Sequence, residues 1–259
     1  NNVGDITEVK VGYDGIVIAN SNTAEKFSLS TMDIYLALAK DIPNPDGSET
    51  FIKNPNKTWK DVNAELPAIK IEVLGPPPTS GTRDAFSELA LEKGGCKKIK
   101  WIKALKKKNK TEYKSKCHTT REDGHFIEAG ENDNLMVQKL VSNPKSLAIF
   151  GFSFLDQNSD KVQGSIINGI EPSFDNIADG KYAISRPLFF YIKNAHVGVI
   201  PGMQEYVEEF LSDSASGDDG YLGEKGLISM PAVERAELNP KVLNLTLIVG
   251  DQSPSKIKK

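Results

Sequence analysis

The residues with the clearest chemical potential lie in the segment TSGTR, residues 79–83. A glycine lets backbone N–H groups approach a ligand closely, hydroxyl side chains add donors, and an arginine offers a planar fork to two oxygens. The first N–H groups of a helix are unpaired and its dipole favours negative charge, so this segment suits phosphate or sulfate if a helix begins there. The pattern therefore predicts an oxyanion site made by Ser80, Gly81, Thr82 and Arg83.

The alternative for the same segment is an ordinary helix cap. Ser80 would then satisfy one helix N–H group, Gly81 would serve the turn, and Arg83 would be solvated. Caps are the commoner use of such residues, but an arginine in the first turn opposes the helix dipole and favours the functional interpretation. A Walker A loop is excluded because no lysine follows the glycine and the glycine spacing differs.

The sequence on either side of this segment predicts the strand and the helix that position it. The apolar run IKIEVL, residues 69–74, reads as a strand that enters the loop, and Phe86, Leu89 and Ala90 before Gly94 and Gly95 predict a helix from about 82 to 93. Residues 43–55 read as a loop and 58–66 as a short helix at most. Other strand patterns alternate with helix patterns and predict an α/β fold: strands at 6–20, 147–155 and 187–194, helices at 30–40, 134–142 and 202–214.

Composition limits the classes of function. The 259 residues are 39% hydrophobic and 26% charged, which is typical of a globular protein. A net charge of -3 gives the whole chain no basic balance for nucleic acid or an anionic membrane, so anion specificity must be local. No stretch approaches the roughly 18 uninterrupted apolar residues of a membrane span. Strand pattern begins almost at once, and we expect N-terminal sequence to be missing.

Two cysteines, Cys96 and Cys117, bracket a 20-residue lysine-rich loop. A disulfide is predicted; it would contribute roughly 3 kcal/mol and imply an oxidising compartment, and two buried free thiols are the alternative. With His118 and His125 the cysteines also offer zinc-ligand types, but the spacing lacks a CxxC or HxxxH element and no metal is predicted.

The remaining charged features are interpreted as surface. Residues 97–116 contain ten lysines, which suit either a basic face for anionic lipid or nucleic acid or, as we prefer, a charged cover over a small apolar stripe. Glu128, Glu131 and Asp133 read as a solvated turn, with Asn132 or Asn134 capping the next helix; Asp14 and Asp84 read as turn or first-turn residues. Because no Ser-His-Asp arrangement or nucleophile elbow is visible, catalysis is not predicted.

A resemblance covers most of the chain through these segments in order: YDGIVIAN, TMDIYLALAK, TWKDVN, SGTRDAF, GENDN, LAIFGFSFL, ISRPLFFYIK and GYLGEKGLISMP. The chain resembles the phosphate-binding proteins of bacterial high-affinity phosphate ABC transporters. The resemblance implies an α/β, two-lobed periplasmic binding protein of type II with hinge-connected mixed sheets. It implies a periplasmic monomer, its signal peptide removed, that captures inorganic phosphate between its lobes and delivers it to the membrane permease, with no cofactor, metal, nucleic-acid partner or enzymatic activity.

The resemblance also implies a lobe assignment and a ligand set. Residues 1–15 and 189–259 would form the first lobe, and 16–188 the second, with hinges near 13–17 and 187–191. Ser80, Gly81, Thr82 and Arg83 would bind phosphate.

Two departures from the family pattern matter. Roughly the first third of the mature family chain supplies half of the phosphate cradle, including an aspartate that accepts the proton of hydrogen phosphate, and that part is absent here. Pro76 stands where many members have arginine, so Arg83 is the only arginine of the loop. Three alternatives stay open: a protein for another tetrahedral oxyanion (sulfate, arsenate or a phosphonate), a secreted phosphatase-like enzyme, and a secreted module that binds a polyanion through residues 97–116.

Overall fold

The computed structural model describes residues 5–130 and 132–244, and the chain divides into two compact units. Unit 1 comprises Asn1–Asp14, Ile177–Asp179 and Arg186–Lys259, and unit 2 comprises Gly15–Asn176 and Gly180–Ser185. Strand β1 (Ile6–Ser21) contributes to both. Most of the apolar run at 243–249 and the charged tail after it lie outside the described residues. The lobe boundaries given above stay a prediction.

Unit 2 is built on a mixed sheet with the strand order β1–β7–β5–β6. Strand β7 (Leu147–Gly151) pairs antiparallel with β1, while β5 (Val73–Gly75) runs parallel to both β7 and β6 (Phe126–Glu128). Leu147 to Phe150 are all buried, which explains why this strand reads as one continuous apolar run. Strand β8 (Val162–Gly164) pairs with β1 at its far end.

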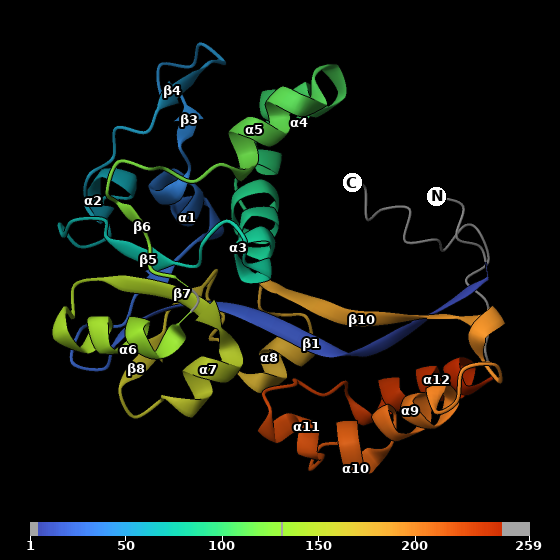
Figure 1. Cartoon of the computed structure of the whole chain (residues 1–259). Coiled ribbons are helices and arrows are strands. Elements are labelled where there is room, and N and C mark those ends of the chain that lie inside the picture. Colours follow the sequence, from blue (N-terminus) through green and yellow to red (C-terminus); the bar gives the residue numbers. More distant parts are fainter. Residues whose placement is uncertain (1–4, 131, 245–259) are drawn as a thin grey trace. The chain divides into compact units, whose positions relative to one another are not determined.

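Helices cover both faces of this sheet (Figure 1). One side carries α1 (Thr31–Leu38) and α3 (Gly81–Phe86), and the other carries α6 (Asp133–Ser142) and α7 (Phe152–Gln157). Helix α3 continues without a break as a π-helical segment, Ser87–Lys93. The local caps agree with the sequence patterns, because Ser30 caps α1 in a capping box and Asn132 caps α6.

The smaller elements of unit 2 lie around this framework. They are the parallel pair β2 (Ser28–Leu29) and β9 (Ile166–Ile167), the hairpin β3 (Asp41–Pro43) and β4 (Phe51–Lys53), α2 (Trp59–Val62), a 3-10 turn at Cys96–Lys98, α4 (Lys100–Lys108) and α5 (Lys110–His118). Helix α8 (Phe174–Ala178) lies where the chain passes between the units.

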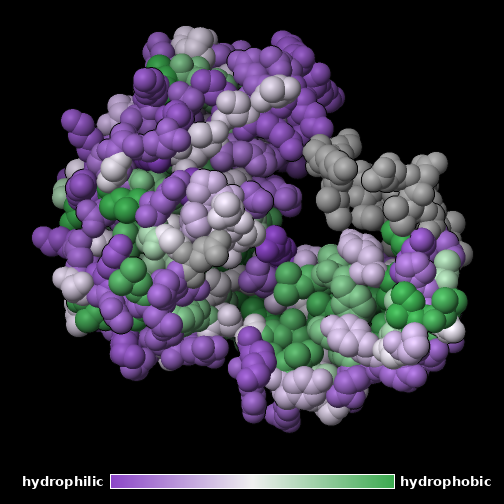
Figure 2. Space-filling view, in the orientation of Figure 1, coloured by the Kyte–Doolittle hydropathy of each residue, from purple (hydrophilic) through white to green (hydrophobic). Residues whose placement is uncertain are grey.

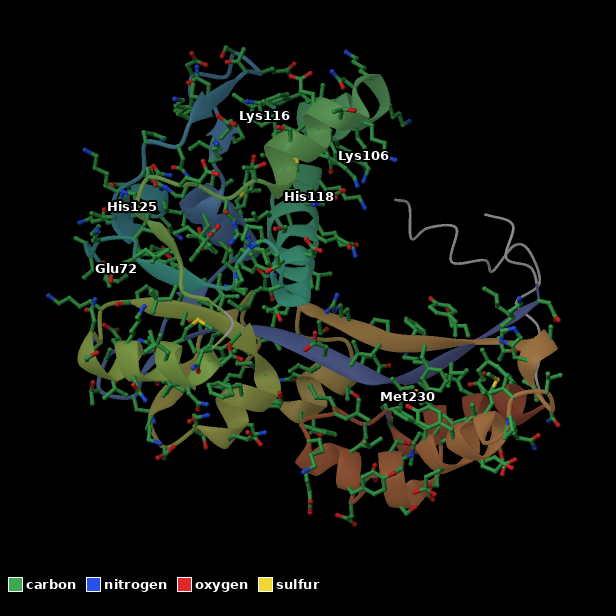
Figure 3. All side chains as sticks on the ribbon, in the orientation of Figure 1. Glu72, Lys106, Lys116, His118, His125 and Met230 are labelled. Atoms are coloured by element: carbon green, nitrogen blue, oxygen red, sulfur yellow. A yellow bond between two sulfur atoms is a disulfide. The ribbon has the colours of Figure 1, made fainter. Side chains whose placement is uncertain are left out.

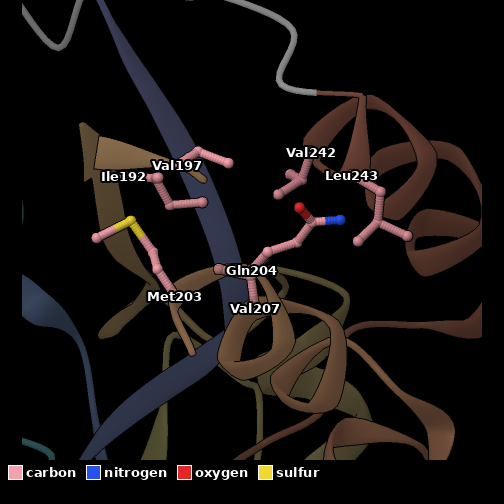
Figure 4. A pocket seen from close by; sticks show the side chains of 7 residues that line it. All are labelled: Ile192, Val197, Met203, Gln204, Val207, Val242 and Leu243. Carbon is pink, nitrogen blue, oxygen red and sulfur yellow. The ribbon is translucent and has the colours of Figure 1, made fainter. Parts of the chain in front are cut away.

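In unit 1, β10 (Ser185–Lys193) lies beside the first half of β1. A 3-10 turn at Asn194–His196 follows it. The helices of this unit are α9 (Met203–Phe210), α10 (Asp213–Ser216), α11 (Tyr221–Glu224) and α12 (Ala232–Leu243). Every second residue of β10 faces the helices, as strand geometry requires. The resulting core contains Val9, Val11, Ile192, Val207, Leu211 and Val242. A small pocket in this core is lined by apolar side chains and Gln204 (Figure 4).

The structure confirms the α/β prediction and corrects it in several places. Of the strand predicted at 69–74, only the last two residues belong to β5 (Val73–Gly75). The segment 43–55 is not only loop, because it forms the β3–β4 hairpin. The run 147–155 is a strand only as far as Gly151, where the chain turns and α7 begins. The predicted helix from 82 to 93 is present, but its second half is π-helical. Within the described ranges, every helix is too short or too polar to cross a lipid bilayer.

Candidate oxyanion site at the start of helix α3

The candidate site lies where β5 leads into α3. Strands β5, β6 and β7 are parallel, so their carboxyl ends share one edge of the sheet, which is where open α/β sheets bind ligands. Gly75 ends β5 at this edge, and a Cβ atom there would collide with the ring of Phe126. The close approach of the Phe126 ring therefore requires glycine as the last residue of β5.

Ser80 is the N-cap of α3, with φ -81° and ψ 132°. Its Oγ accepts a hydrogen bond from the N–H of Thr82 at 3.2 Å, and its own N–H donates to the carbonyl of Pro77 at 3.0 Å. The cap interpretation is therefore correct as a description of Ser80. It does not exclude ligand binding, because a serine hydroxyl that accepts one hydrogen bond still has its own proton to donate.

Gly81 is exposed at the first position of α3, and an added Cβ atom would meet nothing within 4 Å. Its backbone is helical, so neither steric contact nor backbone strain within the chain requires glycine here. Gly81 is thus an open position at the start of a helix that continues to Lys93. Thr82, half-buried, follows it with a hydroxyl on the same turn.

Arg83 is held by the protein itself. Its Nη1 donates to the carbonyl of Pro76 at 2.9 Å, its Nη2 donates to the Thr120 hydroxyl, and its guanidinium carbon lies 4.2 Å from the centre of the Phe126 ring. Glu128 lies at the edge of ion-pair distance, with Oε1 3.9 Å from Nη2. Burial lowers the pKa of Arg83. The negative charges of neighbouring carboxylates, of which Glu128 has the largest effect, act in the opposite direction and raise it. The contacts describe a clamp on the loop before α3, and a phosphate contact from Arg83 stays a prediction.

Sequence reasoning missed the partners of Arg83. Thr120 is buried and lies 37 residues away along the chain, and Phe126 stands on the neighbouring strand. The parallel pairing of β5 with β6 brings Phe126 to the loop, while Thr120 lies outside β6, at an isolated bridge to Ala39. No local pattern signals either contact.

The other acidic residues considered above lie in ordinary settings. Asp14 pairs with Arg186, with Oδ2 3.3 Å from Nη2, and Asp84 is exposed in the first turn of α3. Asn132 caps α6 by accepting from the N–H of Leu135 at 3.2 Å. Glu131 lies outside the described residues.

The predicted disulfide is confirmed, with the sulfur atoms of Cys96 and Cys117 2.06 Å apart. The zinc alternative loses its ligands, because His118 Nε2 lies 2.5 Å from Glu92 Oε2 and His125 Nδ1 lies 2.7 Å from the carbonyl of Ile71. Among residues 5–130 and 132–244, no three His, Cys, Asp or Glu side chains are arranged to hold a metal ion.

A buried carboxylate, Glu92, lies beside this disulfide. Lys106 Nζ lies 2.5 Å and the Tyr113 hydroxyl 3.1 Å from its Oε1, while His118 contacts Oε2 (Figure 3 labels Lys106 and His118). Burial alone would raise the pKa of Glu92, but the hydrogen bonds from His118 and Lys106 outweigh it and lower the pKa to about 2. Glu92 thus ties the π-helical segment to both α4 and α5.

The fold and this loop define the class of protein. Residues 1–214 match the family model of the PBP superfamily domain, and the chain belongs to that family. Among curated proteins it is similar to the phosphate-binding protein PstS of Staphylococcus haemolyticus (strain JCSC1435), with 28% identity over 222 residues, which are 83% of this chain and 57% of that protein. The chain spans about half the length of the curated relatives it matches.

Solved structures support the same class. A protein described as a "possible phosphate binding protein" from Planctomyces limnophilus DSM 3776 matches with a TM-score of 0.67 and 22% identity, over 94% of this chain and 74% of that one. An ABC-type phosphate transport receptor from Vibrio cholerae matches with a TM-score of 0.56 and 18% identity, over 89% and 74%. These likenesses show the fold and confirm the predicted two-lobed α/β class. The family model and the curated relatives named phosphate-binding protein PstS confirm the resemblance.

Proposed function

We propose that the protein captures inorganic phosphate and delivers it to the membrane permease of an ABC transporter. One observation carries the proposal: the open space over Gly81 lies at the carboxyl edge of a parallel sheet, at the start of a capped helix. The relatives named phosphate-binding protein PstS favour phosphate over other oxyanions as the ligand.

In this proposal the first turn of α3 supplies donors to the phosphate oxygens. The backbone N–H of Gly81 and the hydroxyls of Ser80 and Thr82 donate charge-assisted hydrogen bonds to the anion, and the helix dipole adds to them. Arg83 keeps this turn in place through Pro76 and Phe126. Binding involves no covalent step.

Selectivity needs a second kind of group. Hydrogen phosphate carries a proton at neutral pH and sulfate does not, so a carboxylate that accepts this proton selects phosphate. We propose that this carboxylate, with the rest of the cradle, belongs to the part of the relatives' length that this chain does not span. Unit 2, which holds α3, would be one lobe, and closure of the other lobe over the ligand would complete the site.

We further propose that the protein works as a monomer outside the cytoplasm, in the periplasm or its equivalent. The Cys96–Cys117 disulfide supports this location, because such bonds persist in oxidising compartments.

The test is calorimetric titration of phosphate, with sulfate as the control ligand, into the full-length protein and a Ser80→Ala, Thr82→Val variant. Loss of two hydrogen bonds to a charged ligand should weaken phosphate binding by about 3–6 kcal/mol. A matched variant, Thr111→Val with Ser115→Ala, removes two exposed hydroxyls of α5 and should bind like the wild type.

Phosphate affinity that survives the Ser80 and Thr82 substitutions in a folded protein would show that the α3 turn is only a cap. Equal binding of sulfate and phosphate would instead favour a protein for tetrahedral oxyanions in general.

A further inference from the structure

A dense run of lysines lies in the hairpin formed by α4 and α5, which we call the lysine hairpin, residues 97–116. It holds ten lysines and one acidic residue, Glu112, although the whole chain has a net charge of -3. Because the hairpin is positively charged, the residues outside it carry a larger net negative charge than the chain as a whole. A space-filling view shows hydrophilic residues over this region (Figure 2).

Some of these lysines serve the fold. Lys106 binds Glu92, Lys116 Nζ lies 2.9 Å from Oδ2 of Asp41, and Lys98 donates to the Thr31 hydroxyl at 2.8 Å. These contacts fasten the hairpin to the body of unit 2.

Another group of lysines has no such role. Lys100, Lys103 and Lys107 are exposed, and their spacing of three and four residues puts them on one face of α4. Within the part of the chain that the structure describes, no carboxylate lies within ion-pair distance of these three ammonium groups. They form a basic stripe along the outer helix of the hairpin.

The lysines of this stripe destabilise helix α4. Like charges three and four residues apart repel one another, and Lys100 and Lys110 open α4 and α5 at the ends where the helix dipole disfavours cations. The disulfide at the base and the Glu92 contacts offset that cost. A local feature that opposes folding and is held in place by dedicated contacts is typical of a functional surface.

The types of side chain in the stripe indicate which kind of anionic partner it fits. All ten cations are lysines, which act as compact point charges without the two-pronged geometry that arginine gives to defined phosphate sites. The aromatic rings of the region are turned inward, since Trp101 packs on Phe51 with ring centres 4.8 Å apart and Tyr113 is buried. The exposed face therefore lacks the rings on which single-stranded nucleic acid stacks.

The position of the hairpin suits a flat surface. Helix α4 packs mainly on α5 and on the 3-10 turn at its own base, and lies on the outside of unit 2 (Figure 1). A helix is about 10–12 Å across, whereas charges are screened over about 8 Å at physiological ionic strength. The acidic residues in the body of unit 2 are thus largely screened from a surface that α4 touches.

We propose that the lysine hairpin docks the protein on an anionic phospholipid surface through Lys100, Lys103 and Lys107. The contact is electrostatic, because no large apolar side chain on this face is free to insert. It is independent of phosphate binding at α3, so failure of one proposal leaves the other intact.

The experiment is flotation of the full-length protein with vesicles of phosphatidylglycerol mixed into phosphatidylcholine, compared with phosphatidylcholine alone. The variant is Lys100→Gln, Lys103→Gln, Lys107→Gln. Each lysine near an anionic surface contributes about a factor of five, so the variant should lose roughly 100-fold in partitioning to the anionic vesicles. Wild-type binding should fall steeply as salt is added.

The matched control is Lys60→Gln, Lys139→Gln, Lys145→Gln, which removes the same charge from exposed lysines on α2, on α6 and after α6. It should reduce partitioning far less. Equal losses in the two variants would show that net charge alone governs adsorption and would overturn the proposal. Binding to polyphosphate or DNA without any preference for anionic vesicles would also overturn it, because the partner would then be a polyanion in solution.

Discussion

The guanidinium of Arg83 stacks on the ring of Phe126, with 4.2 Å between the guanidinium carbon and the ring centre. This contact joins the loop before α3 to the neighbouring strand β6. Because Arg83 also donates to the carbonyl of Pro76, one side chain fixes both the start of the loop and the first turn of the helix. The turn that contains Ser80, Gly81 and Thr82 is thereby held in place.

The clamp predicts the effect of Arg83→Met. Loss of the hydrogen bonds and of the cation–π contact should lower the free energy of unfolding by about 2–4 kcal/mol, measured by urea denaturation. Phosphate affinity should fall less than in the Ser80 and Thr82 variant. An unchanged unfolding free energy with abolished phosphate binding would contradict the clamp and make Arg83 a direct ligand.

The space over Gly81 predicts that Gly81→Ala separates stability from binding. Alanine favours a helix by up to about 1 kcal/mol over glycine, and its Cβ would meet no atom of the chain, so the unfolding free energy should stay equal or rise. The same methyl group would stand where we place the phosphate, and titration should show affinity at least tenfold lower. Gly223→Ala, at a helical glycine that is equally open, is the control and should leave affinity unchanged.

The contacts of Glu92 predict a loss of stability in acid. Its pKa is lowered from 4.5 to about 2 in the folded protein, so its contribution is complete above pH 4.5 and disappears as the pH falls towards 2. Screening by solvent reduces that contribution to about 2 kcal/mol. Urea denaturation of the wild type and Glu92→Gln should therefore differ at pH 7 and converge near pH 2.

The control for this effect is Glu88→Gln, which removes an exposed carboxylate one turn earlier. Its ion pair with Lys93 is solvated, and exposed pairs contribute about 0–1 kcal/mol. A difference between wild type and Glu92→Gln that stays constant down to pH 2 would show that the Glu92 charge is not the stabilising feature.

Removal of the disulfide should destabilise the protein without affecting the ligand site. In the chain-entropy description, a crosslink over a sequence separation of 21 stabilises by about 3 kcal/mol. The Cys96→Ala, Cys117→Ala variant should show this loss in urea denaturation and bind phosphate normally once folded. A parallel loss of phosphate affinity would mean that the hairpin and α3 are coupled.

Local patterns were sufficient for much of the fold. The caps at Ser30 and Asn132 depend on residues within one helical turn, and Asn132 is one of the two cap residues predicted for that helix. The alternation of strands and helices predicts the class. The apolar run through Gly151 could not be divided correctly, because four apolar residues in a strand and three in the first turn of a buried helix look alike.

The site was predictable only in part. The residue types of the segment 79–83 are enough to predict an oxyanion site, but the contacts of Arg83 depend on residues that are distant in the sequence and meet only in the fold. The β3–β4 hairpin was missed because its strands are three residues long and its turn is rich in Asn, Asp, Gly and Ser. The π-helical turn after α3 leaves no mark in the apolar spacing at all.

The bond between Cys96 and Cys117 closes the lysine hairpin at its base, and both cysteines are fully buried. The hairpin can therefore open at its outer end while its two ends stay fixed in the core. Amide hydrogens of α4 should exchange with solvent through such local opening, whereas those around the crosslink exchange only when the whole unit unfolds. The crosslink therefore allows α4 to unfold locally while the rest of unit 2 stays folded.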